Sequence, residues 1–294
     1  MYSTLERLLP WLVRAAWGVL PFTLGPALAA ALDDRSRPVQ VVASVVLWGV
    51  WALVLVATLA PHPLGLTALR SAAPAALVTA TVAAAGGHGS SLSTAASMVT
   101  AGLAMVVVFL PETAALFANG PAYPNERRLP LRVPGALVLG IVPGAWAMAV
   151  GAPTAGLLLL AARQWIPGAI VLAVGTPVVV ALHRSLHALS RRWVVFVPAG
   201  MVLHDPLALT DPVLFPRRGI EVLRPAPAGS ESLDLTQGAP GLALELVLRE
   251  EATLMLAQPR NRPGRSVTAD RLLFTPTRPG AVLREAGARR VPTG

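Results

Sequence analysis

The sequence of 294 residues is 54% hydrophobic and only 13% charged, and it contains no cysteine. Soluble domains average about 25% charged residues, so this composition indicates an integral membrane protein, and the missing cysteines exclude disulfides, thiolate catalysis and Cys-ligated zinc. All 24 cationic residues are arginines and the net charge is +9, but the excess lies at the ends of apolar runs, where it orients a chain in a bilayer, so no nucleic-acid partner is expected.

Apolar runs in residues 1–192 predict a transmembrane domain of about six helices, each close to the ~20 residues that a bilayer core requires. The first run raises an alternative, because Arg7 and Arg14 precede Ala27-Leu28-Ala29 in the manner of a signal peptide over residues 1–31. Its length favours a retained helix. Residues 133–162 contain three prolines and predict one tilted or broken helix. The predicted spans are 9–32, 39–60, 71–86, 98–118, 134–162 and 166–186.

The arginines predict the orientation of these helices, because cytoplasmic loops carry an excess of positive charge. With the N-terminus inside, the outer loops hold Arg163 and also Arg35 and Arg37, which Asp33 and Asp34 offset. The inner segments hold Arg7, Arg70, Arg127, Arg128, Arg132, Arg184, Arg191 and Arg192. We therefore expect a multi-pass plasma-membrane protein with both termini in the cytoplasm.

Residues 193–290 predict a small β-rich α+β cytosolic domain of roughly five to seven strands and one C-terminal helix. Pro198-Ala199-Gly200 joins the first two strands in a hairpin. Thr277 is the expected cap of the helix, and Val282, Leu283 and Ala286 form its apolar face. Residues 291–294 are expected to fray. The predicted strands are 193–197, 201–204, 219–223, 233–236, 242–249 and 252–258, with loops at 225–232 and 259–265.

Two motifs carry a resemblance to a known fold. Arg191-Arg192-Trp193-Val194-Val195-Phe196-Val197-Pro198-Ala199-Gly200 follows directly after a membrane helix, and Phe274-Thr275-Pro276-Thr277-Arg278-Pro279 leads into the last helix. This stretch resembles bacterial PH-like domains attached to membrane anchors, and the whole chain resembles uncharacterised multi-spanning membrane proteins of high-GC actinobacteria. The resemblance implies a binding module. Its first hairpin loop lacks the basic residues of phosphoinositide-binding PH domains, so no ligand residue is transferred.

Glu112 is the only acidic residue inside a predicted span. An ionisable group in the bilayer suggests a proton or ion relay, or a counter-charge for a substrate. Alternatively, the helix ends at Pro111 and Glu112 lies near the cytosolic interface with Asn119 and Arg127. Arg14 either pairs with Glu112 or extends its side chain to the inner interface, which its place in the first turns of its helix favours.

A basic collar ends the last predicted span. His183, Arg184, His187, Arg191 and Arg192 are expected to face anionic headgroups, at about 1 kcal/mol for each arginine. His183 and His187 have the i, i+4 spacing of metal ligands, with His204 and Asp205 beyond them, but no acidic residue completes a metal-binding motif.

The remaining motifs predict no chemistry. Gly140-Ile141-Val142-Pro143-Gly144 contains a G-x-x-x-G pattern, a candidate helix contact that Pro143 would disturb. Ser90, Ser91, Ser93 and Ser97 lie near His88, but no acidic residue orients this histidine and no nucleophile motif is present. The sequence therefore predicts no catalytic, cofactor-binding or metal-binding residue.

The expected function is a non-enzymatic membrane anchor or adaptor, in which the PH-like module binds a protein or peptide, for instance by strand addition. An alternative is a small transporter that uses Glu112 and the broken helices 4 and 5. A third class, a membrane-embedded enzyme, has no candidate nucleophile, acid pair or cofactor site.

Overall fold

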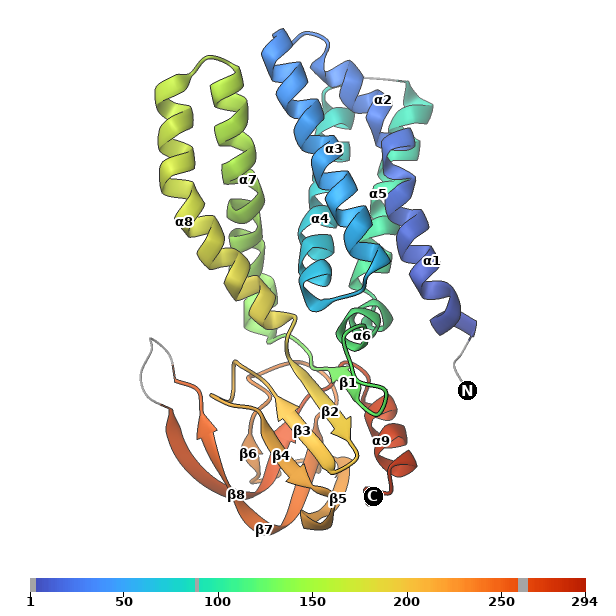
Figure 1. Ribbon diagram of the computed structural model, residues 1–294, viewed down its shortest axis with the longest axis vertical. Coiled ribbons are helices and arrows are strands. Elements are labelled where there is room, and N and C mark those ends of the chain that lie inside the picture. Colours follow the sequence, from blue (N-terminus) through green and yellow to red (C-terminus); the bar gives the residue numbers. More distant parts are fainter. Residues whose placement is uncertain (1–3, 88–89, 259–263) are drawn as a thin grey trace. The chain divides into compact units, whose positions relative to one another are not determined.

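The computed structural model describes residues 4–87, 90–258 and 264–294. The chain forms two compact units, each built from two segments (Figure 1). The membrane unit contains Met1–Phe117 and Gly144–Leu186, and the β unit contains Ala118–Pro143 and His187–Gly294.

Six helical segments of the described chain are long and apolar enough to cross a membrane, which confirms the predicted helical membrane region. The first consists of α1 (Thr4–Gly18) and α2 (Leu20–Leu32). The others are α3 (Arg37–Leu59), α4 (Pro63–Ala85), α5 (Ser91–Phe109), α7 (Val142–Ala161) with the π-helical turn Leu137–Ile141 before it, and α8 (Trp165–Leu189). The short helix α6 (Pro111–Asn119) follows α5.

Two of these helices begin earlier than the sequence predicts, because caps start them. The His62 ring accepts a hydrogen bond from the Leu64 amide, and Pro63 occupies the first position of α4. Leu64–Arg70, which lies between the predicted spans 39–60 and 71–86, is therefore helical. The Ser90 hydroxyl caps α5 by accepting a hydrogen bond from the Ser93 amide. Such side-chain oxygen and nitrogen acceptors satisfy amides that have no partner within the helix.

The two tryptophans Trp17 and Trp51 join α1 to α3 by reciprocal hydrogen bonds. The Trp17 Nε1 donates to the Trp51 carbonyl at 3.0 Å, and the Trp51 Nε1 donates to the Trp17 carbonyl at 3.2 Å. Between α4 and α5, fully buried alanines such as Ala73 and Ala101 allow the backbones to approach closely. The hydrophobic effect does not drive association between helices in lipid. Close packing of small residues and hydrogen bonds from tryptophan therefore stabilise these helix contacts.

The helices α7 and α8 form a hairpin that depends on glycine. A Cβ atom on Gly156 would lie 2.6 Å from a methyl carbon of Leu172. Before this hairpin, the Val142 amide donates to Leu137 in a π-helical turn. Pro143 follows and has no amide hydrogen to donate, so the irregular turn precedes the residue that interrupts the regular ladder.

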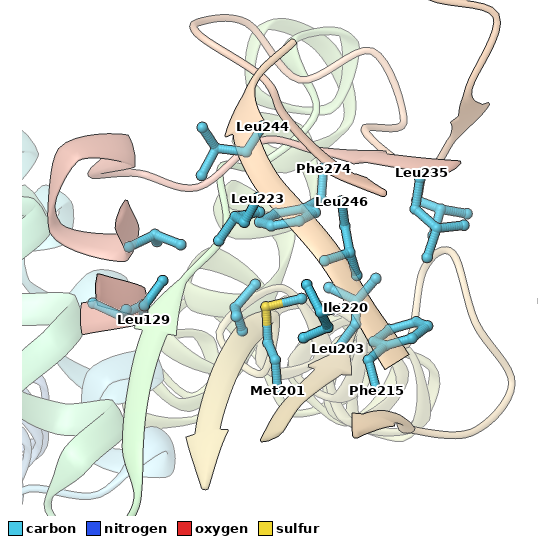
Figure 2. Packing of buried hydrophobic residues seen from close by; sticks show 14 of the residues in the cluster. Leu129, Met201, Leu203, Phe215, Ile220, Leu223, Leu235, Leu244, Leu246 and Phe274 are labelled. Carbon is cyan, nitrogen blue, oxygen red and sulfur yellow. The ribbon is translucent and has the colours of Figure 1, made fainter. Parts of the chain in front are cut away.

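The β unit contains two four-stranded sheets. One has the order β1 (Arg127–Pro130), β2 (Trp193–Val197), β3 (Gly200–His204) and β4 (Val213–Pro216), with all neighbours antiparallel. The other has the order β5 (Ile220–Pro225), β7 (Leu244–Leu256), β8 (Arg265–Phe274) and β6 (Leu233–Asp234), in which β6 is parallel to β8. Both sheets contribute to one core, which includes Met201, Phe215, Leu223 and Phe274 (Figure 2). A β-rich region therefore accompanies the membrane helices, as predicted.

The strand β1 comes from the connection between α6 and α7, where the sequence predicts only a loop. Leu129 and Leu131 alternate into the core and are 6% and 5% exposed. The Asn119 side chain satisfies the outer edge of the strand: its Nδ2 donates to the Arg128 carbonyl and its Oδ1 accepts from the Arg128 amide, at 2.7 and 2.8 Å. The β unit therefore begins well before residue 193.

The second sheet also differs from the prediction. The expected strands 242–249 and 252–258 form one strand, β7, with an irregularity between Val247 and Ala252. The partner strand β8 was not predicted, and it begins at Arg265, the last residue of an expected loop whose residues 259–263 lie outside the described chain. The first part of β8 alternates between exposed polar residues and the small apolar residues Val267 and Ala269, which are only partly buried.

The C-terminal helix α9 (Pro279–Ala288) forms as predicted, with Val282 and Ala286 fully buried. Thr277 does not cap it, and its hydroxyl donates to the Pro130 carbonyl at 3.0 Å instead. The last residues, expected to fray, form backbone hydrogen bonds with β5: the Leu223 amide donates to Pro292 at 2.9 Å, and the Gly294 amide donates to Leu223 at 3.2 Å.

A fragment of residues 187–294 should not fold cooperatively, because it lacks β1. Losing a buried leucine side chain typically costs about 2–5 kcal/mol, and β1 with the residue after it supplies Leu129 and Leu131 to a domain whose whole stability is typically about 5–15 kcal/mol. Adding a peptide of residues 118–133 should restore a cooperative transition and dispersed NMR signals. A fragment that unfolds in the same way with and without the peptide would contradict this role of β1.

Candidate functional site

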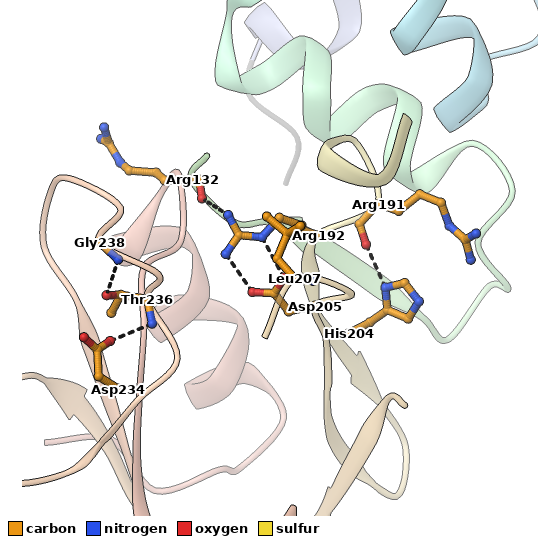
Figure 3. Close-up of polar contacts among 9 residues, drawn as sticks. All are labelled: Arg132, Arg191, Arg192, His204, Asp205, Leu207, Asp234, Thr236 and Gly238. Atoms are coloured by element: carbon orange, nitrogen blue, oxygen red, sulfur yellow. Dashed lines mark hydrogen bonds and ion pairs between the residues drawn. The ribbon is translucent and has the colours of Figure 1, made fainter. Parts of the chain in front are cut away.

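A buried ion pair joins Arg192 to Asp205 (Figure 3). The Arg192 Nε donates to Asp205 Oδ1 and its Nη2 donates to Oδ2, both at 2.7 Å, and both side chains are 1% exposed. The Arg192 Nη1 donates to the Arg132 carbonyl at 2.6 Å, and the Leu207 amide donates to Asp205 Oδ1 at 3.1 Å. The pair is therefore held by further hydrogen bonds on both sides.

The prediction that Arg192 faces headgroups is wrong. Trp193 pairs with His204 in the β2–β3 register, so Arg192 and Asp205 occupy the next opposed positions of the hairpin. The core surrounds them there, and Arg192 is 2% exposed as a whole residue. Arg192 of the predicted collar and Asp205, thirteen residues further along the chain, therefore form a structural pair.

His204 lies beside this pair in a second set of contacts. Its Nδ1 is 2.7 Å from the Arg191 carbonyl (Figure 3). Its ring stacks on Trp193 with centroids 5.3 Å apart. Arg128 contacts the same indole ring, with its Cζ atom 5.3 Å from the centroid. Burial lowers the pKa of His204 from its usual value. The imidazole is therefore held neutral by its surroundings, as expected for a partly desolvated base.

The other collar residues lie in or directly after the end of α8. Arg184 and Arg191 are exposed, and His183 and His187 are partly exposed. Within residues 4–87, 90–258 and 264–294, no three His, Asp or Glu side chains gather closely enough to hold a metal ion. His88, the histidine of the predicted serine loop, lies outside the described residues.

Glu112 lies beyond the end of the α5 span. The apolar segment ends at Phe109, and Glu112 is in the first turn of α6. This placement matches the alternative in which the membrane helix ends near Pro111. Arg14 contacts other groups: its Nε donates to the Thr58 carbonyl at 3.4 Å, and its Cζ lies 5.0 Å from the Trp11 ring.

Two charged groups were missed as site residues by the sequence analysis. Arg70, expected in a connection, lies in α4 with its Cζ 5.5 Å from the Phe109 ring. Glu245, which lies in the predicted strand 242–249, is 1% exposed. Its carboxylate accepts hydrogen bonds from Ser230, Ser232 and Arg224 at 2.5, 2.7 and 2.8 Å.

The pKa of Glu245 results from opposed effects. Burial raises it, but the hydrogen bonds from the two serines and the arginine together lower it below the usual value. Glu245 therefore stays ionised and anchors the loop before β6. No sequence signal marks it, since its partners lie 13 to 21 residues away.

Two sheet edges of the β unit are covered, whereas β4 pairs only with β3 among the described strands. The residues after α9 pair with β5, and Asn119 and Thr277 cover β1: the Thr277 amide donates to the Pro130 carbonyl at 2.9 Å. The strand β8 differs. Beside it, β6 pairs only with Leu272 and Leu273, so residues 265–271 have no strand partner on their outer side among the described residues.

No protein-family profile, curated protein or solved structure matched the chain. A functional assignment therefore depends on the geometry of the chain itself.

Removing Arg192 alone should destabilise the protein strongly. Arg192→Met leaves the Asp205 carboxylate buried without its cation, which typically costs about 3–5 kcal/mol, whereas replacing both partners by apolar residues is often close to neutral. We expect Arg192→Met with Asp205→Leu to recover most of the loss in chemical denaturation of the detergent-solubilised protein. The exposed neighbour Arg191→Gln is the matched control and should change stability by less than about 0.5 kcal/mol. A double variant as unstable as the single one would contradict this account.

Stability should fall as the pH falls below the ordinary pKa of histidine. The folded protein keeps His204 neutral, whereas the unfolded chain takes up a proton near pH 6.5, so the unfolded state binds more protons in acid. Thermal unfolding midpoints between about pH 7.5 and 5.5 should therefore decrease more for the wild type than for His204→Gln. Equal slopes for the two proteins would show that His204 does not carry the effect.

Proposed function

We propose that the protein is a multi-pass plasma-membrane protein with cytoplasmic termini, and that its β unit is a PH-like, non-enzymatic module that binds an extended segment of a protein partner. The observation that carries this proposal is the open outer edge of β8 at residues 265–271. Backbone amides and carbonyls along such an edge are a template for an added strand.

The direction of the backbone groups supports strand addition. The Thr210 amide donates to the Met255 carbonyl, so the backbone of Met255 points away from β8. Ser266 lies opposite Met255 and Thr268 lies two residues further along, opposite Thr253. At a non-hydrogen-bonded position of an antiparallel pair, the backbone N–H and C=O groups of both residues point away from the partner strand. The amides of Ser266 and Thr268 are therefore directed to the outer side of β8.

The side chains of this edge suit an extended peptide. Val267 and Ala269 are partly buried, whereas Ser266 and Thr268 are exposed. The free edge of seven residues spans about 23 Å at roughly 3.3 Å per residue. An incoming strand would thus meet a small apolar face and a small polar face, with Arg265 and Arg271 at the ends.

Two further features support the module and its location. Two sheets that share one core, together with a C-terminal helix, match the arrangement that the PH-like resemblance implies. The arginine distribution supports cytoplasmic termini.

The test is a substitution that removes one outward donor from the edge. Thr268→Pro deletes the outward amide and leaves the β7 side of the ladder intact, because proline is tolerated on edge strands where its nitrogen faces solvent. Thr268→Ala is the matched control, since it alters the same side chain and keeps the amide. Full-length variants would be expressed in cells, cross-linked and captured from membranes.

We expect the wild type and Thr268→Ala to capture the same partner, and Thr268→Pro to lose it while its thermal unfolding stays close to that of the control. The partner should also slow hydrogen exchange at the amides of Ser266 and Thr268. Undiminished capture by a folded Thr268→Pro variant would reject strand addition at β8.

A further inference from the structure

Arg70 is an arginine within a membrane-spanning helix. It follows the start of α4 at Pro63 by seven residues, which places it about 10 Å along the helix axis. It shares a helix face with Leu66 and Ala73, which are 2% and 0% exposed. A charged side chain on the buried face of a spanning helix is costly and is by default a functional residue.

The guanidinium of Arg70 is incompletely satisfied. Its Nε atom is buried and has no hydrogen-bond partner, a condition shared in the described chain only by the Thr275 hydroxyl. The Phe109 ring lies 5.5 Å from Cζ and gives a cation–π contact, but it offers no oxygen acceptor to this N–H group. The residue as a whole is partly exposed, but its Nε atom is buried, so a ligand must displace neighbouring groups to contact that atom.

We propose that Arg70 binds a phosphoryl group of a ligand. A guanidinium presents Nε and one Nη as two parallel donors, which match two oxygens of a phosphoryl group. The buried Nε supplies the donor that such a bidentate contact uses. The position about two turns into α4 lies within reach of the interface, where phospholipid headgroups are always present.

The same chemistry has two sources: the headgroup of an anionic phospholipid, or a free phosphate. The inference concerns the membrane unit alone and does not depend on strand addition at β8. Glu112 in α6 is the acidic residue that an internal ion pair would require, and the experiment therefore includes it.

Full-length protein would be reconstituted in nanodiscs of phosphatidylcholine, with or without phosphatidylglycerol, and with or without inorganic phosphate. The readouts are the shift of the thermal unfolding midpoint and the phospholipid retained in native mass spectrometry. The variants are Arg70→Gln and Arg70→Lys. Arg14→Gln is the matched control, because Arg14 also contacts an aromatic ring but its Nε already donates to the Thr58 carbonyl.

We expect phosphatidylglycerol or inorganic phosphate to stabilise the wild type and Arg14→Gln, and the affinity to fall about tenfold or more in Arg70→Gln, as expected for loss of a charge-assisted bidentate contact. A response to phosphatidylglycerol alone identifies a lipid headgroup, and a response to inorganic phosphate identifies a free phosphate. Arg70→Lys should lose most of the shift as well, because lysine has no parallel donors.

Two results would overturn the proposal. One is a ligand-induced shift of the thermal unfolding midpoint in Arg70→Gln that equals the shift of the wild type. If Arg70→Gln does not fold, the same result in Arg70→Lys overturns the proposal. The other is restoration of stability when Glu112→Gln is added to Arg70→Gln, because recovery on removal of both charges identifies an internal ion pair.

Discussion

The antiparallel pairing of β1 with β2 is the constraint on which the β unit depends. It brings Arg127–Pro130 against Trp193–Phe196, although the helices α7 and α8 separate them in the sequence. Closing such a long loop costs conformational entropy before any contact forms. The pairing is stabilised by Leu129 and Leu131 in the core, by the Asn119 amide on the outer edge and by the contact of Arg192 with the Arg132 carbonyl. The two segments of the β unit therefore support each other.

The choice of arginine follows from the same packing. At Arg192 and Arg224, two guanidinium nitrogens contact a carboxylate whose own exposure is 1%. Lysine presents a point charge and would leave acceptors of the buried carboxylate unfilled. Since breaking one partner of such a pair is far more costly than replacing both, these arginines specify the position of their loops and strands more than they add to overall stability.

The sequence predicted elements whose pattern is local, and it failed where pairing is distant. Long apolar runs identify membrane helices because a bilayer demands them, and Pro198-Ala199-Gly200 identifies a hairpin because both strands are adjacent. The segment containing β1 is short and rich in Arg and Pro, and its strand character depends on a partner more than sixty residues away. The first part of β8 alternates, but only Val267 and Ala269 form its apolar side, and both are small and partly buried. Arg192 was misplaced because sequence position alone cannot distinguish a collar arginine from one that the register of a hairpin aligns with Asp205.

The two candidate sites, the β8 edge and Arg70, differ in the free energy that a bound ligand would contribute. The outer amides of β8 are exposed, so water already satisfies them, and each hydrogen bond to an added strand contributes a net of only about 0.5–1.5 kcal/mol. The Nε of Arg70 is buried without an acceptor, and a buried donor left unsatisfied typically costs about 1–3 kcal/mol, more when it is charged. The β8 edge therefore permits a partner, whereas Arg70 gains free energy from the first suitable acceptor. This difference in free energy is the reason why the proposed phosphoryl site lies in the membrane unit and is independent of the proposed strand addition at β8.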